Sequence, residues 1–144
     1  FFVGRTNKEI KKLVEVTYEC MKEAILLVRP GKRLGDIGHT IQTLAENNHY
    51  SVVREYCGHG IGKIFHEEPQ VLHYGKPNTG IELKEGMIFT IEPMINLGKR
   101  FVQLRDDNWT VETQDKKYSA QWEHTILVTK NGFEVLTKRP DEDF

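Results

Sequence analysis

The hydrophobic pattern of the chain changes its period near residue 50, and this change constrains the fold class more than any other feature. In the segment Ile10–Val28, apolar residues recur at spacings of three and four along two adjacent stripes, which predicts a long helix packed flat on a sheet. The segment Thr6–Glu9 has the sequence of a capping box and predicts the start of this helix, which Pro30–Gly31 ends. A second helix carries the apolar positions of Ile37–Ala45 on one face and is expected to end at Asn47–Asn48.

Beyond residue 50 the pattern is that of strands. The strand-like runs are Ser51–Tyr56, Met87–Glu92, Phe101–Arg105, Trp109–Thr113, Ala120–Thr129 and Phe133–Thr137. The run Gly58–Gly62 holds three glycines, which favours a turn or a close backbone approach over regular structure. Asn131–Gly132 is a strong hairpin signal. Two helices followed by four or five antiparallel strands predict the α+β class, with residues 1–144 forming one domain or a large piece of one.

Charge and composition exclude several classes of protein. The 144 residues carry 20 basic and 21 acidic side chains, so the net charge of −1 gives no electrostatic attraction toward nucleic acid or anionic membranes. No run approaches the roughly 20 apolar residues that are needed to span a bilayer. Two cysteines are too few for a disulfide framework. We therefore expect a globular cytoplasmic protein with reduced thiols.

The first four residues, Phe1–Gly4, have the pattern of a strand end whose beginning is absent. They have neither the basic stretch nor the small-residue cleavage site of a signal peptide. We expect that further residues precede this segment in the natural protein.

Two glutamates stand where the pattern of apolar residues should exclude charge. Glu92 ends an apolar strand, and Glu123 lies within another. Burial of a carboxylate is costly unless a positive charge compensates it. The pair is therefore expected to share a cation or protons, although an ordinary salt bridge at a strand end would also account for either residue.

His66 is the candidate nitrogen ligand that would complete a site with Glu92 and Glu123. It follows the glycine-rich run and precedes an acidic pair and a proline. One imidazole and two carboxylates suit divalent Mn, Fe, Co or Zn. This donor set resembles a catalytic metal site more than a structural one, because structural zinc sites are usually rich in cysteine. Spacing along the chain does not establish that the three side chains meet.

The other histidines have simpler interpretations. His59 lies among glycines, where it either holds the loop by hydrogen bonding or has a functional role. His73 is either a second imidazole of the site or a surface group at a strand end. His124 alternates away from the preceding glutamate, so core packing is expected. His39 and His49 have polar neighbours and should be solvated.

Three long motifs resemble those of one enzyme family and occur in the same order. They are Gly58–His73, Gly86–Met94 and Ser119–Thr125, and they are similar to the C-terminal half of type I (bacterial-type) methionine aminopeptidases. The resemblance covers the chain from Phe1 to about Leu136. It implies the pita-bread (creatinase/aminopeptidase) fold, here two helices packed on a curved, mainly antiparallel sheet. It also implies metal-dependent removal of the initiator methionine from nascent proteins.

The resemblance further implies roles for individual residues. His66, Glu92 and Glu123 would be metal ligands, with Glu123 shared between two divalent ions (Mn, Fe, Co or Zn). His73 would be a catalytic residue that contacts the substrate near the scissile peptide, and Trp109 would line the methionine pocket. The expected partner is the N-terminal methionine of a nascent polypeptide, bound by a monomer.

Differences between the family's subgroups narrow the resemblance. Proline-specific aminopeptidases typically have Glu-Pro-Gly where this chain has Glu92–Met94, and type II enzymes insert a helical subdomain between the two glutamates. Type I is therefore favoured. The family's two aspartate ligands and a further histidine come from its N-terminal half and have no counterpart in these 144 residues, so this chain alone is expected to be inactive. The alternatives are a non-catalytic pita-bread module that binds peptides or proteins, and a proline-specific relative.

Overall fold

In the computed structural model, which describes residues 2–144, the chain begins with a helix, α1 (Lys8–Leu26). The cap is Asn7, whose side-chain oxygen accepts a hydrogen bond from the Ile10 N–H at 2.8 Å. The capping box expected from Thr6 is therefore wrong by one residue. Asn7 is an equally good cap, and its extended backbone lets the side chain reach the first turn. The turn after the helix contains Gly31, at φ +87°, as the Pro-Gly signal predicts.

The second helix, α2 (Leu34–Asn47), packs against α1 and ends where the sequence predicts. Its first turn is fixed by Asp36. One carboxylate oxygen of this residue accepts from the Arg33 N–H at 2.8 Å, and the other accepts from the Asn78 N–H at 2.7 Å. Asp36 thus ties the start of α2 to the loop that precedes β4.

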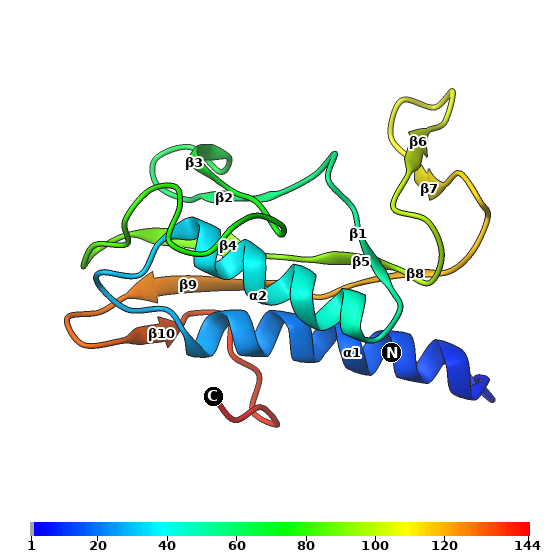
Figure 1. Cartoon of the computed structure of the whole chain (residues 1–144), viewed down its shortest axis with the longest axis horizontal. Helices are drawn as coiled ribbons and strands as arrows, with labels where there is room; N and C mark the ends of the chain where they lie inside the picture. The colour runs from blue at the N-terminus through cyan, green and yellow to red at the C-terminus, as the bar shows by residue number, and fades with distance from the viewer. Residues whose placement is uncertain (1) are drawn as a thin grey trace.

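Within residues 2–144, ten short strands follow the helices. They are β1 (Ser51–Val52), β2 (Gly58–Gly60), β3 (Glu67–Val71), β4 (Ile88–Ile91), β5 (Met94–Asn96), β6 (Val102–Leu104), β7 (Val111–Thr113), β8 (Ser119–Gln121), β9 (His124–Val128) and β10 (Phe133–Val135). All pairs are antiparallel. A five-stranded sheet has the order β10-β9-β4-β2-β3, a three-stranded sheet has the order β1-β5-β8, and β6 and β7 form a separate hairpin that projects from the body of the molecule (Figure 1).

One long hairpin connects the two larger sheets. β4 continues into β5, and β8 continues into β9, so that β4 pairs with β9 and β5 pairs with β8. The register is the same on both sides: Ile91 is opposite His124, and Met94 is opposite Gln121. The residues between these pairs lie outside the ladder. The hairpin is therefore interrupted at the same level in both of its arms.

Several strand predictions need correction. The run Ser51–Tyr56 forms a strand only at Ser51–Val52, and Ala120–Thr129 is divided between β8 and β9. The segment Gly58–Gly60, expected to be irregular, is strand β2. Glycine is normally unfavourable in a strand, but here it allows a close approach between strands. A β-carbon added at Gly58 would lie 2.3 Å from the Thr90 carbonyl oxygen.

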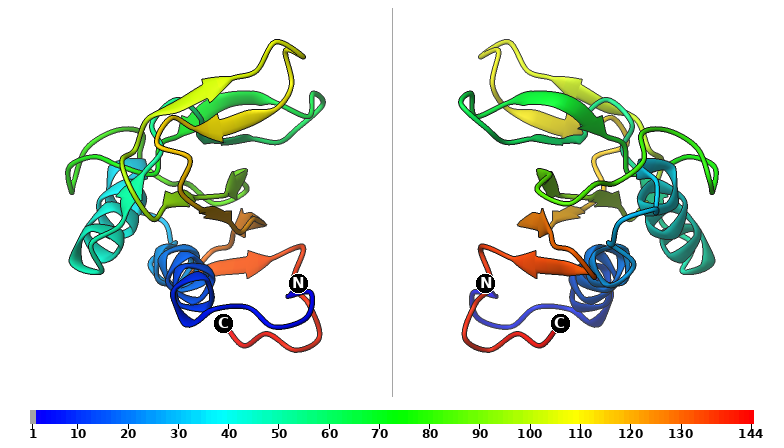
Figure 2. Two further views of the ribbon diagram at one scale, coloured as in Figure 1. Left: turned by 90° about the vertical axis from the view of Figure 1, so that its right-hand side faces the viewer. Right: turned by 90° about the vertical axis from the view of Figure 1, so that its left-hand side faces the viewer.

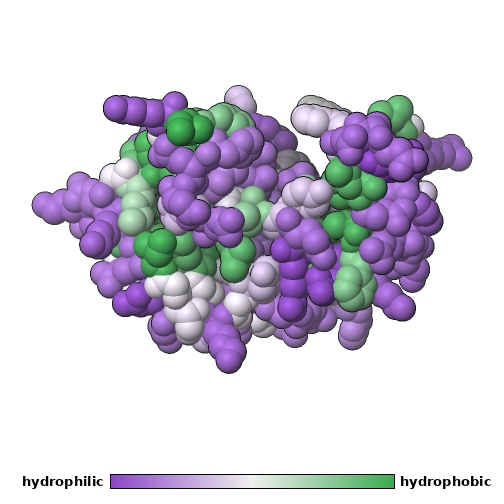
Figure 3. Space-filling view, turned by 90° about the horizontal axis from the view of Figure 1, so that it is seen from above, coloured by the Kyte–Doolittle hydropathy of each residue, from purple (hydrophilic) through white to green (hydrophobic). Residues whose placement is uncertain are grey.

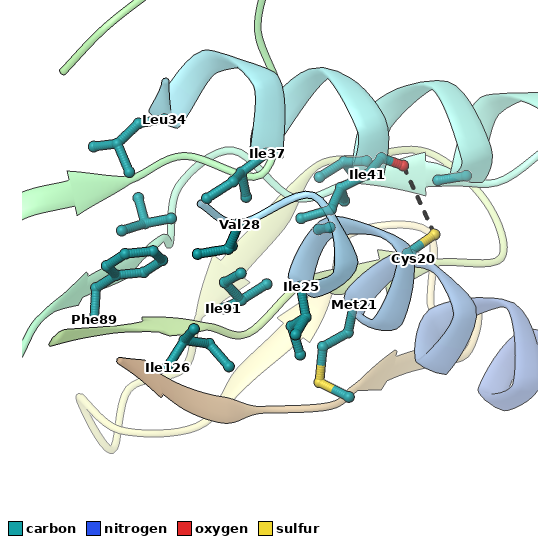
Figure 4. Close-up of a cluster of buried hydrophobic side chains, with 14 of the residues drawn as sticks. Cys20, Met21, Ile25, Val28, Leu34, Ile37, Ile41, Phe89, Ile91 and Ile126 are labelled. Atoms are coloured by element: carbon teal, nitrogen blue, oxygen red, sulfur yellow. Dashed lines mark hydrogen bonds between the residues drawn. The ribbon is translucent and has the colours of Figure 1, made fainter. Parts of the chain in front are cut away.

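The core lies between the helices and one face of the sheets. α1 contacts β4, β5 and β8, and α2 contacts β1 and β3 (Figures 1 and 2). Met21 and Ile25 of α1 point toward Ile91 and Ile126 of the sheet (Figure 4). The helices cover this face, so the functional groups that face solvent lie on the other. Among the described residues, no helix combines the length and apolar character that a membrane span requires.

Candidate metal centre

Glu92 and Glu123 occupy opposite positions at the interruption of the long hairpin. The register on either side places them across from each other, between the Ile91–His124 pair and the Met94–Gln121 pair. Opposite residues in an antiparallel pair have β-carbons about 4.5 to 5.5 Å apart, and like charges at such positions repel each other. The two carboxylates therefore repel each other, and a cation bound between them would relieve the repulsion. The sequence prediction that Glu92 and Glu123 act together is consistent with this geometry.

The third member of the group is His59. One ligand atom from each of His59, Glu92 and Glu123 lies within 4.8 Å of the others. The His59 Nε2 is 3.4 Å from Glu92 Oε1. His59 is on β2, which pairs directly with β4 through Gly60 and Phe89. The glycines on either side of His59 bring the imidazole next to Glu92, because β2 has no side chains there to hold the strands apart.

Thr90 connects two members of this group. Its side chain is fully buried, and its hydroxyl donates a hydrogen bond to Glu92 Oε1 at 2.6 Å. The Thr90 hydroxyl oxygen in turn accepts from the His59 backbone N–H at 3.0 Å. Thr90 lies two residues before Glu92 and therefore shares its face of β4.

Glu92 is in an environment that disfavours its charge. Burial raises the pKa of its carboxyl above the ordinary value, and the nearby charge of Glu123 adds to this effect, against the lowering effects of the Thr90 hydrogen bond and of His59 and His66. A divalent cation between the carboxylates would reverse this balance, because an opposite charge at short range favours the ionised form.

His66 lies beside this group and not within it. It is exposed in the loop between β2 and β3, and its ring packs edge-on against the His59 ring with centroids 4.3 Å apart. The assignment of His66 as the nitrogen ligand stays a prediction, and the structure adds His59 as a second imidazole close to Glu92. The sequence contained the signal, because a histidine flanked by glycines in a strand can approach a neighbouring strand closely. The glycines were instead interpreted as a loop.

His73 does not reach the open side of the group. Its side chain is 2% exposed, and its Nε2 accepts a hydrogen bond from the Glu92 N–H at 3.2 Å. Burial lowers the pKa of His73 to about 3, so the imidazole is neutral. The role of His73 as a catalytic, substrate-contacting residue stays a prediction, and in this structure its ring supports the backbone of Glu92.

Trp109 lies between β6 and β7, and it is 86% exposed. The hairpin that carries it projects away from the sheets (Figure 1). Its place in the methionine pocket stays a prediction. Its amide N–H is held by Asp107, which fixes the turn.

A cleft of about 670 Å³ opens beside the group. Four glutamates and two histidines line it, together with apolar and aromatic side chains. The lining residues are Glu55, Tyr56, Cys57, His59, Ile64, His66, Glu67, Glu68, Gln70, Glu92 and Met94. Seen from this side, the surface is mostly hydrophilic and is hollowed between the β2–β3 region and the β6–β7 hairpin (Figure 3). His59 and Glu92 thus border a solvent-accessible space.

Comparison with known proteins identifies the family. Residues 1–130 match the model of the metallopeptidase family M24. The chain belongs to this family. It is 55% identical over 141 residues to the methionine aminopeptidase of Rickettsia prowazekii (strain Madrid E), covering 97% of this chain and 54% of that protein. It is 52% identical over 142 residues to the methionine aminopeptidase of Escherichia coli (strain K12), covering 99% and 54%. The chain spans about half the length of the curated relatives it matches.

Solved structures of M24 proteins confirm the α+β pita-bread fold. The crystal structure of the methionine aminopeptidase from Rickettsia prowazekii superposes with a TM-score of 0.94 at 55% identity, covering 96% of this chain and 56% of that one. The prolidase from Pyrococcus furiosus superposes with a TM-score of 0.72 at 27% identity, covering 96% and 35%. The predicted resemblance to bacterial methionine aminopeptidases is confirmed, and the proline-specific proteins are more distant.

M24 proteins are metallopeptidases, and the residues of this chain fit a divalent ion. An imidazole nitrogen and two carboxylates converge within 4.8 Å, and the two carboxylates face each other without a cationic side chain between them in the group. Nitrogen and oxygen donors in this combination suit borderline divalent metals.

Proposed function

We propose that this chain is the metal-binding C-terminal part of a methionine aminopeptidase that removes the initiator methionine from nascent proteins in the cytoplasm. The observation that carries the proposal is the convergence of His59, Glu92 and Glu123 beside an open cleft. The proposed substrate class rests on identities of 52 to 55% with bacterial methionine aminopeptidases.

Glu92 and Glu123 would hold the metal together with an imidazole, that of His66 as the family resemblance implies or that of the adjacent His59, and Glu123 would be shared between two ions. The ions would be Mn, Fe, Co or Zn, since this donor set accepts each of them. When bound, they would lower the pKa of a coordinated water and polarise the substrate carbonyl. Glu123 is suited to the shared position because its side chain is exposed and has two anionic oxygens.

The residues around the group would bind and orient the peptide. The exposed imidazole of His66, held against the His59 ring, is available to donate a hydrogen bond to a peptide carbonyl. Phe65 packs against the same two rings, with centroids 5.6 Å from His59 and 4.6 Å from His66, and is 67% exposed. An aromatic face at this position would contact the methionine side chain, whose sulfur interacts favourably with aromatic rings.

The alternative is a non-catalytic module that binds peptides or proteins. The cleft and the exposed loop between β2 and β3 would serve such a module equally well. It has no need, however, for two opposed carboxylates and an imidazole, which together cost stability when no cation is present.

The test is release of methionine from a Met-Ala-Ser peptide with excess Mn²⁺ or Co²⁺. The assay compares the 144-residue chain alone with the chain after addition of the N-terminal half of the Escherichia coli relative. We expect no turnover by the chain alone and turnover by the mixture, with loss of that turnover in Glu123→Gln. Binding of neither metal by the chain or the mixture would favour the module.

A further inference from the structure

The C-terminal segment Thr137–Phe144 contains a carboxylate that the proposed metal centre does not use. Glu142 is 4% exposed, in a stretch that the sequence suggests is a charged tail. Its carboxylate accepts hydrogen bonds from the Arg139 backbone N–H at 2.9 Å and from the Arg139 guanidinium at 2.8 Å. It also lies 3.1 Å from His124 Nε2. Burial of an unpaired carboxylate would be costly, and these donors compensate for the burial of Glu142.

His124 is held by the C-terminal segment through both of its ring nitrogens. It is 3% exposed, and its Nδ1 lies 2.9 Å from the Thr137 hydroxyl oxygen. That oxygen accepts from the Thr125 N–H at 3.0 Å, so the hydroxyl hydrogen is free to be donated to Nδ1. The Nε2–H is then donated to Glu142. Every polar atom of the imidazole has its partner in this segment.

The residue on the other side of Glu123 is anchored as well. The guanidinium of Arg139 lies over the Trp122 ring, 4.5 Å from its centroid. The Trp122 Nε1–H donates to the Val14 carbonyl of α1 at 3.1 Å. The segment ends at Phe144, whose ring meets the His124 ring edge-on at 5.4 Å. Both neighbours of Glu123 are thus fixed from the face opposite to its carboxylate.

Glu123 needs such support because it lies where the β-ladder is interrupted. The ladder ends at Gln121 and resumes at His124, so the pairing with β4 and β5 does not fix the residues between. The exposed Glu123 side chain is also repelled by Glu92 when no cation lies between them. A backbone that moves here would move one of the proposed ligands.

We propose that Thr137–Phe144 is a latch that positions Glu123 for metal binding, with Glu142 and His124 as positioning residues. The inference rests on the proposed metal centre, because it assigns Glu123 a ligand role. The latch acts through the backbone of residues 122–125 and touches neither the metal nor the substrate.

The test compares Glu142→Gln with Asp141→Asn in the full 144-residue chain. Both variants remove one negative charge from the latch, but the Asp141 side chain is 82% exposed. Co²⁺ affinity is measured by titration of its visible absorption, and amide hydrogen exchange is measured at residues 122–125. We expect Glu142→Gln to weaken Co²⁺ binding by about tenfold, as loss of outer contacts to metal ligands does elsewhere, and to speed exchange at these amides. Asp141→Asn should match the wild type in both measurements.

A second pair of variants keeps the test decisive if Glu142→Gln does not fold. Thr137→Val removes the hydroxyl that contacts His124 and Thr125, whereas Thr137→Ser retains it. Weak Co²⁺ binding in the first and normal binding in the second would support the latch. Equal Co²⁺ affinity in the wild type, Glu142→Gln and Thr137→Val would overturn the latch and leave the metal centre intact. Absence of Co²⁺ binding by the wild type, both alone and after addition of the N-terminal half of the Escherichia coli relative, would overturn the metal centre and, with it, the positioning role.

Discussion

The hydroxyl of Thr90 donates a hydrogen bond to Glu92 Oε1 at 2.6 Å, and so fixes the direction of a carboxylate that faces the proposed metal. The Thr90 hydroxyl oxygen accepts from the His59 backbone N–H at 3.0 Å. One buried side chain therefore contacts both Glu92 and His59, which come from different strands.

Thr90→Val should weaken metal binding, because valine has the same shape but neither donates to Glu92 nor accepts from His59. We expect a loss of about tenfold in Co²⁺ affinity. The unpaired His59 N–H should also lower the free energy of unfolding by about 1 to 3 kcal/mol. Thr90→Ser keeps the hydroxyl and should restore most of the affinity. Isothermal titration with Co²⁺ and urea unfolding of both variants provide the measurements. If the serine variant bound Co²⁺ as weakly as the valine variant, the hydroxyl would not be the group that supports metal binding.

His59→Ala and His66→Ala distinguish the two adjacent imidazoles. His59 lies within 4.8 Å of both carboxylates, so we expect its removal to reduce Co²⁺ affinity by more than tenfold and to alter the visible spectrum of the bound ion. His66 is outside this group, and its removal should leave both nearly unchanged. The reverse pattern would return the ligand role to His66.

The stability of the chain should depend on pH through Asp36. Burial raises the pKa of this carboxyl, but backbone hydrogen bonds from Asn78 and Arg33 and the charges of Lys32 and Arg33 together lower it by more, so its pKa in the folded chain is below the ordinary 3.8. A depressed pKa means that the stabilisation is complete above about pH 4 and is lost as the pH falls through the folded-state pKa.

Asp36→Asn should therefore reduce the free energy of unfolding at pH 7, by about 0.5 to 2 kcal/mol for a lost helix-terminal contact. The difference from the wild type should shrink as the pH falls below 4. Thermal unfolding of both proteins between pH 7 and pH 3 measures this, and a difference that stays constant over the range would contradict the assignment.

The two cysteines should differ in reactivity. Cys20 is fully buried, its thiol contacts the Ile41 carbonyl, and burial raises its pKa to about 12 (Figure 4). Cys57 lines the cleft and is only partly buried. We expect a thiol reagent at pH 8 to modify Cys57 alone in the folded chain, and both residues after unfolding in guanidinium. Equal rates for the two thiols in the folded chain would show that Cys20 is not sealed in the core.

The sequence predicted those parts of the fold and of the site that depend on local residue patterns. α1 and α2 follow from hydrophobic periodicity, and Glu92 and Glu123 are conspicuous because a carboxylate in an apolar strand needs a partner. The position of His59 beside Glu92 was not predicted, because β2 is three residues long and exists only by pairing with β3 and β4. The glycines that permit this pairing have the local signature of a loop.

Burial was the other property that the sequence could not supply. His73 lies within the run Val71–Gly75, and only tertiary packing makes it a buried acceptor for the Glu92 N–H. Glu142 lies in a run of charges that resembles a solvated tail, and tertiary contacts with His124 bury it. Both residues are placed by segments distant in sequence, so no local pattern reports their role.

The most direct test of the metal centre is paramagnetic line broadening in the ¹⁵N-labelled chain on addition of Mn²⁺. The account predicts that the backbone amide resonances of His59, Glu92 and Glu123 and their sequence neighbours broaden first, with the effect on all three lost in Glu123→Gln. Broadening centred instead on the exposed acidic turn at Asp106–Asp107, or no selective broadening at any Mn²⁺ concentration that the chain tolerates, would contradict it.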